Sequence, residues 1–152
     1  MRAPAPTTEL ANAKTSREMV TAKWGGALAA GFQIVPNVLI RAQSRLGLDA
    51  LDLAILLNIT LHWWGPGDLP YPRTSVIANR VGVSVRTVER RLERMQADDL
   101  LVRHPPEKIR DGLAIRRFDL SGLVERLQKL AEANLEMRRR GIYYDADDEE
   151  GE

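Results

Sequence analysis

The stretch that decides the fold is ANRVGVSVRTVERRLERM, Ala78–Met95, which predicts two helices joined by a tight turn. Ala78 is small, as the crossing of two helices requires, and Gly82 adopts the positive φ of such a turn without strain. Ser84 is in position to cap the second helix, which we expect over 85–96. The apolar residues expected to hold the two helices together are Ile77, Val81, Val83, Val88 and Leu92.

The second helix carries a basic surface on the side away from Val88 and Leu92. Arg86 and Arg90 are four residues apart and share one face. Because arginine pairs bidentately with the edge of guanine, this pattern predicts a helix that enters the major groove of double-stranded DNA. The alternative is a solvated helix whose glutamates and arginines pair with one another. The residues of this helix that we predict to contact DNA are Ser84, Val85, Arg86, Thr87, Arg90, Arg91 and Arg94.

A β-hairpin is predicted directly after this helix. Two β-capable runs, Leu100–Arg103 and Leu113–Phe118, flank a Pro-Pro…Asp-Gly segment. The tip carries Lys108 and Arg110, which we predict to contact the DNA backbone; the alternative is an ordinary turn with solvated charges. The return strand carries two adjacent arginines, and strand alternation would leave one of them facing a phosphate.

The segment SVIANRVGVSVRTVERRLERMQADDLLVR closely resembles the winged helix-turn-helix of bacterial, phage and plasmid DNA-binding proteins. The resemblance covers about residues 72–103 and implies a DNA-binding domain in which the hairpin is the wing. It departs from the family at Asp99, where many members have glycine, which suggests an altered helix exit. It also departs at Arg73, where many have a serine cap, so we expect Thr74 to cap the first helix and add a DNA contact. The matching positions are Ile77, Ala78, Gly82, Val83, Ser84, Arg86, Thr87, Val88, Arg90, Leu92, Met95, Leu100, Leu101 and Arg103.

The region before this unit predicts a helix over about 36–46 and then a central core helix. The segment LDALDLAILLNITLHWW is apolar almost all round, so we expect it to be buried. Asp49 can cap this helix, with Asp52 supporting its first turn. We expect Trp63 and Trp64, at its end, to pack under the following loop.

The last predicted helix, over 121–140 with Ser121 as its cap, has an apolar stripe at alternating steps of three and four residues. We predict that this stripe forms a homodimer, which would present two recognition helices to a palindromic site. The alternative is a helix that packs back onto its own domain. The predicted dimerisation residues are Leu123, Leu127, Leu130, Asn134 and Met137.

Charge is distributed unevenly along the 152 residues. The net charge is only +1, but residues 71–140 hold 16 Lys/Arg against 10 Asp/Glu, whereas residues 141–152 hold six acids and no base. We expect a disordered acidic tail over 141–152, which is solvated, binds a protein partner or covers the basic surface. We also expect a flexible arm over 1–23. There is no cysteine, no signal-peptide core and no apolar run of membrane-spanning length, so we predict a cytoplasmic protein.

These patterns predict a mainly α fold with one small β-hairpin: a winged helix-turn-helix domain over 24–120 with an extra C-terminal helix. The predicted function is sequence-specific binding of double-stranded DNA in transcription regulation. One alternative is a phage or plasmid replication-initiation or organiser module, and another is a protein-docking module that binds no DNA. No catalytic group, cofactor or metal site is predicted, since the two histidines have no partner at metal-ligand spacing.

Overall fold

The computed structural model describes residues 17–139, with side chains through residue 135. The chain divides into two compact units, Met1–Ile34 and Val35–Glu152. In the first unit, residues 17–24 are helical and continue into a 3-10 helix, η1 (Gly25–Ala30), none of whose residues is buried. The described part of the arm expected over 1–23 is therefore helical, which its Arg, Glu, Met, Ala and Lys residues favour.

The second unit begins with α2 (Asn37–Arg41), which is shorter than the helix predicted to residue 46. Residues 42–47 form turns instead, and Gly47 has a φ of 71°. The Gln43 side chain donates to the carbonyl of Ile40 at 3.1 Å, so it satisfies one of the acceptors that the end of α2 leaves open. Leu46 and Leu48 are nevertheless buried, which brings the chain into the core before α3.

The predicted core helix is confirmed as α3 (Ala50–Thr60), with Ile55, Leu56 and Ile59 completely buried. Asp49 and Asp52 form a capping box in which each side chain accepts the backbone N–H of the other residue. The prediction for the two tryptophans is half right. Trp63 packs against the core, whereas Trp64 is 85% exposed because the helix has ended four residues before it.

The predicted helix pair is confirmed as α4 (Thr74–Val81) and α5 (Val85–Ala97). Gly82 lies between them with a φ of 74°, and its N–H donates to the carbonyl of Ala78 at 2.9 Å. The Ser84 hydroxyl caps α5 by accepting the N–H of Thr87 at 3.1 Å. The predicted Thr74 cap is wrong, because Arg73 occupies the cap position without a side-chain bond and Thr74 is the first helical residue.

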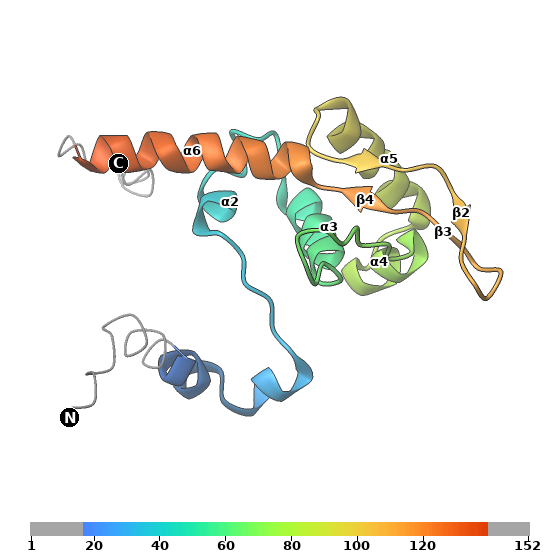
Figure 1. Ribbon diagram of the computed structural model, residues 1–152, viewed down its shortest axis with the longest axis horizontal. Helices are drawn as coiled ribbons and strands as arrows, with labels where there is room; N and C mark the ends of the chain where they lie inside the picture. Colours follow the sequence, from blue (N-terminus) through green and yellow to red (C-terminus); the bar gives the residue numbers. More distant parts are fainter. Residues whose placement is uncertain (1–16, 140–152) are drawn as a thin grey trace, which may run out of the picture. The chain divides into compact units, whose positions relative to one another are not determined.

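The predicted hairpin is present, but its ladder is interrupted. β1 (Val102–Arg103) pairs with β4 (Phe118–Asp119), and further out β2 (Glu107–Lys108) pairs with β3 (Ala114–Ile115), both antiparallel. Pro105 and Pro106 separate the two ladders on the first side, since proline has no N–H to donate to a ladder. Figure 1 shows the hairpin extending beyond the α4–α5 pair.

The last helix, α6 (Ser121–Arg139), packs against α2 and the core. Its first turn is capped differently from the prediction, because Ser121 is already helical and its N–H donates to the Asp119 carboxylate at 2.8 Å. The same hydrogen bond holds the pKa of Asp119 below its usual range. With α3, α4, α5 and the hairpin, the second unit is a winged helix-turn-helix with an extra C-terminal helix, as the sequence predicts (Figure 1).

The exit from α5 is left-handed at Asp99, which has a φ of 57°. Many of the proteins that the sequence resembles have glycine at this position, and a residue with a Cβ is strained in the left-handed conformation that Asp99 adopts here. We expect Asp99→Gly to raise the free energy of unfolding by roughly 1 kcal/mol, the left-handed strain minus the entropy cost of glycine. Urea denaturation measures it, and Asp98→Gly is the matched control. Asp98 has a φ of −86°, so its replacement by glycine should destabilise. If Asp99→Gly and Asp98→Gly changed the free energy of unfolding equally, the left-handed conformation of Asp99 would not be strained.

Candidate nucleic-acid interface

The outward face of α5 presents Arg86 and Arg90 to solvent. Both side chains are exposed and lie one helical turn apart, opposite the buried Val88 and Leu92. Among the side chains described, those of residues 17–135, neither guanidinium has an ion-pair or hydrogen-bond partner. Val85, in the first turn, is also exposed. The face that sequence reasoning assigned to the major groove is therefore accessible.

Ser84 and Thr87 stand at the N-terminus of α5, where orphan backbone N–H groups and the helix dipole favour an anion. Their hydroxyl oxygens lie 2.9 Å apart, and either can donate to the other. One hydroxyl hydrogen of the pair consequently remains available for an acceptor such as a phosphate oxygen. Thr74, by contrast, lies near Glu89, and its hydroxyl helps Arg103 to lower the pKa of that carboxyl.

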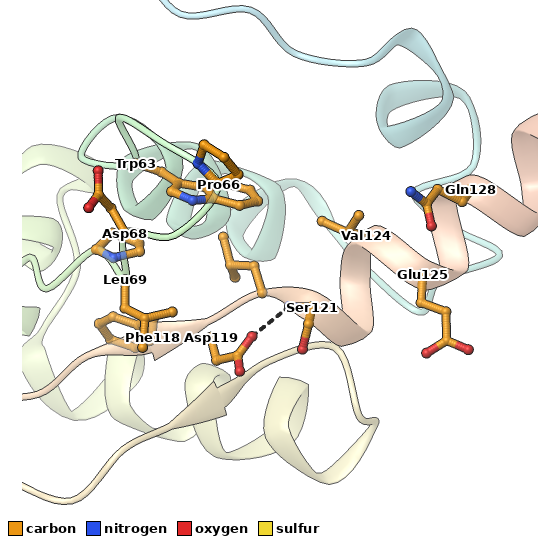
Figure 2. Close-up of a pocket in the computed structure, with 12 residues that line it drawn as sticks. Trp63, Pro66, Asp68, Leu69, Phe118, Asp119, Ser121, Val124, Glu125 and Gln128 are labelled. Carbon is orange, nitrogen blue, oxygen red and sulfur yellow. Dashed lines mark hydrogen bonds between the residues drawn. The ribbon is translucent and has the colours of Figure 1, made fainter.

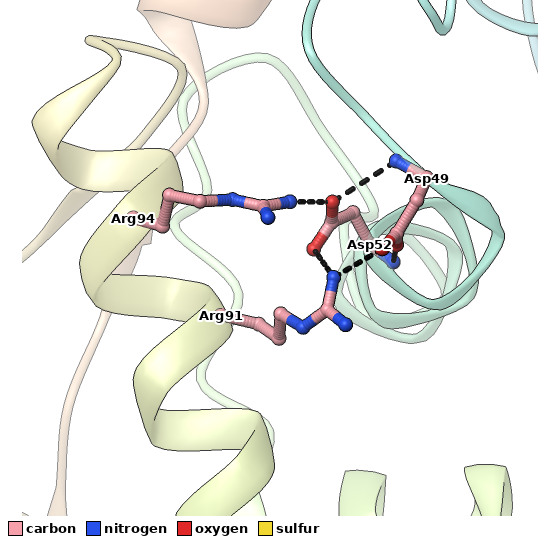
Figure 3. A network of polar contacts seen from close by, with 4 residues as sticks. All are labelled: Asp49, Asp52, Arg91 and Arg94. Atoms are coloured by element: carbon pink, nitrogen blue, oxygen red, sulfur yellow. Dashed lines mark hydrogen bonds and ion pairs between the residues drawn. The ribbon is translucent and has the colours of Figure 1, made fainter.

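Arg91 and Arg94, also predicted to contact DNA, have partners within the chain. Figure 3 shows both side chains reaching from α5 to the start of α3. Arg91 pairs with Asp49 and lies 3.3 Å from an oxygen of Asp52, while Arg94 pairs with the other oxygen of Asp52. The Asp52 side chain is completely buried, so these arginines neutralise a charge that would be costly to leave alone. Arg91 and Arg94 thus differ from Arg86 and Arg90 in having carboxylate partners within the chain.

The pKa of Asp49 is lowered to about 2, first by the backbone N–H of Asp52 and then by Arg91. The same ion pair raises the pKa of Arg91. Both groups are therefore charged throughout the physiological range. Sequence reasoning identified the two aspartates as a helix cap and missed this second role, because their partners lie about 40 residues further along the chain.

The opposite flank of α5 is tied to the hairpin through Arg103 of β1. Glu89 pairs with the Arg103 guanidinium, and the side-chain oxygen of Gln96 accepts the backbone N–H of Arg103 at 2.8 Å. The pair with Arg103 lowers the pKa of Glu89. The guanidinium also lies over the ring of Phe118, 5.7 Å from its centroid. The helix and the wing are consequently held in a fixed relation, a role that sequence reasoning did not assign to Arg103.

The tip of the hairpin presents Lys108 and Arg110, both exposed. Both arginines of the return strand have partners within the chain. Arg116 donates to the carbonyl of His104 at 2.9 Å, while Arg117 pairs with Glu107 at 2.7 Å and lies over the ring of Tyr71. Residues 116–117 lie between β3 and β4, so strict strand alternation does not govern their side chains.

The stripe predicted for dimerisation is used largely within the chain. Leu123 and Leu127 belong to the buried core, and Leu130 packs against it. These leucines therefore pack onto their own domain, because this face of α6 points toward the core. Asn134 is exposed, whereas the side chain of Met137 and the acidic tail predicted over 141–152 lie outside the described residues. Homodimerisation stays a prediction.

A groove of about 580 Å³ lies on another part of the second unit, between the loop after α3, β4 and the first turns of α6 (Figure 2). Trp63, Leu69 and Phe118 contribute apolar surface, and Asp68 and Glu125 contribute carboxylates. None of its lining residues comes from α5 or the hairpin tip. The groove is consequently separate from the candidate interface.

Residues 17–139 bring together no group of three or more His, Cys, Asp or Glu side chains suited to a metal ion. None of the helices described has the length and apolar character required to cross a membrane.

Comparison with known proteins yields a distant structural likeness. The chain is similar in structure to a possible transcriptional regulator from Methanosarcina mazei Go1, with 15% sequence identity and a TM-score of 0.42. The match covers 70% of this chain and 83% of that one. No protein-family model and no curated protein matches the chain.

Proposed function

We propose that the second unit binds double-stranded DNA sequence-specifically and acts in transcription regulation, with α5 in the major groove. The observation that carries the proposal is the accessible pair Arg86 and Arg90. They project from a helix whose opposite face is locked into the core and whose two flanks are tied to α3 and β1. A rigidly held helix with accessible arginines on its outward face suits base recognition, because each bidentate contact requires a fixed geometry.

The remaining contacts follow from the chemistry at the edges of this face. Val85 can touch a thymine methyl group, and the Ser84–Thr87 hydroxyl pair can donate one hydrogen bond to a phosphate. Lys108 and Arg110 at the wing tip would contact the flanking backbone. The base edges then supply specificity, while the wing and the helix N-terminus fix the register.

The proposal is tested by selecting bound duplexes from a random pool and titrating the selected duplex against salt concentration. We expect an enriched motif that contains guanines. The log–log slope should be about −2 for each bound chain, since the two wing cations each neutralise about one phosphate. Absence of enrichment, with no complex even at low salt, would contradict DNA binding and favour a protein-docking module.

A further inference from the structure

The four arginines of α5 fall into two chemically different pairs. Arg86 and Arg90 have no ion-pair or hydrogen-bond partner among the side chains of residues 17–135, whereas Arg91 and Arg94 are held by Asp49 and Asp52 at the start of α3. A basic helix that binds DNA by charge alone would gain from four accessible arginines. Here two fixed carboxylates pair with half of them and so neutralise those two charges within the chain.

The carboxylates are held in place by the helix that bears them. The Asp52 side chain accepts the N–H of Asp49 at 3.0 Å, and the Asp49 side chain accepts the N–H of Asp52 at 2.9 Å. Both stand at the N-terminus of α3, where the helix dipole favours negative charge. They therefore act as a permanent counter-charge rather than as mobile surface acids.

The arginines they hold are close to the accessible face. Arg94 follows Arg90 by four residues, and its side chain is 45% exposed although it pairs with the buried Asp52. The Arg91 side chain is 22% exposed. If the aspartates carried no charge, these long side chains could turn toward phosphates beside the groove.

We propose that Asp49 and Asp52 determine the specificity of DNA binding by withholding Arg91 and Arg94 from the phosphate backbone. This inference rests on the proposed function. Phosphate contacts supply essentially all of the affinity for non-specific DNA, which the protein can approach in many orientations. In a specific complex the contacts of Arg86 and Arg90 fix the register of α5. Withholding the other two arginines consequently weakens non-specific binding more than specific binding.

The test is Asp49→Asn with Asp52→Asn, because asparagine caps a helix as well as aspartate does but carries no charge. We expect affinity for a duplex without the selected motif to rise by roughly fivefold to tenfold for each released arginine at about 0.1 M salt. The log–log salt slope should steepen by roughly 0.9 for each released arginine. The gain on the selected duplex should be smaller, so the specificity ratio falls.

Two matched controls separate release of the arginines from a general change in charge. Adding Arg91→Ala and Arg94→Ala to the asparagine variant should return non-specific affinity to the wild-type value without leaving a buried carboxylate unpaired. Asp68→Asn with Glu132→Gln removes the same charge from exposed residues outside α3 and α5 and should change non-specific affinity little.

Several outcomes would overturn the inference. These are unchanged non-specific affinity in the asparagine variant, an equal gain on both duplexes, or an equal gain in the control that lacks Asp68 and Glu132. If the double variant does not fold, Asp49→Asn carries the test with a smaller expected gain, because Arg91 then keeps only its 3.3 Å contact with Asp52 while Asp52 keeps its partner Arg94. A wild-type protein that forms no specific complex would refute the proposed function itself, whereas an intact specific complex with unchanged non-specific affinity refutes only this inference.

Discussion

Replacing Arg86 and Arg90 together by alanine is expected to weaken binding to the selected DNA site by roughly a hundredfold or more. Each bidentate arginine–guanine contact contributes about 1–3 kcal/mol of discrimination, and tenfold in affinity corresponds to about 1.4 kcal/mol. The thermal melt should stay nearly unchanged, because both side chains are exposed and form no hydrogen bond or ion pair with the described side chains. Fluorescence-anisotropy titration gives the affinity, and circular dichroism gives the melt.

The matched control removes two exposed arginines elsewhere in the second unit, Arg45→Ala with Arg126→Ala. This change lowers the net charge equally, so it isolates the contribution of position from that of charge. We expect the control to lose only a few-fold in affinity and to keep its preference for the selected site. Equal losses in the two variants would mean that the protein senses DNA through charge alone, and no loss in the first would mean that α5 does not read the groove.

The part of this interface that could be predicted from sequence is the part fixed by local chemistry. Gly82, Ser84 and the helical spacing of Val88 and Leu92 determine where the turn lies, where α5 begins and which face is buried. Those constraints act within about ten residues of one another. The outward direction of Arg86 follows from them directly.

What could not be predicted depends on contacts between distant elements. The period of α5 shows that Arg91 and Arg94 lie off the buried face, but not that two carboxylates from α3 would meet them there. The stripe of α6 is ambiguous for the same reason, because Leu123 and Leu127 would have the same spacing against a partner helix as against their own core. Asp99 lies between these cases, since the missing glycine is visible in the sequence but the left-handed φ that Asp99 adopts is known only from the folded chain.

The second large effect is expected at Gly122, where α6 begins against the exit of α5. A Cβ at this residue would lie 2.1 Å from the backbone carbonyl oxygen of Asp99, and the N–H of Leu123 donates to the carbonyl of Leu100 at 3.0 Å. In an ordinary helix, alanine is about 1 kcal/mol more favourable than glycine. Here Gly122→Ala should instead destabilise by roughly 3 kcal/mol, near the upper end for overpacking, because the obstructing atom is backbone and cannot turn aside.

Helix propensity and the clash with Asp99 predict opposite signs for the change in unfolding free energy, so Gly122→Ala tests how closely α6 packs against the exit of α5. A loss of roughly 3 kcal/mol should lower the melting temperature by about 10 °C in a domain of this size. Gly67→Ala is the matched control, since no atom lies within 4 Å of a Cβ there and its φ is not in the left-handed region. We expect that control to be neutral or slightly stabilising, because alanine restricts the unfolded chain. If Gly122→Ala also stabilised, as helix propensity alone predicts, the first turn of α6 could not lie against the carbonyl of Asp99.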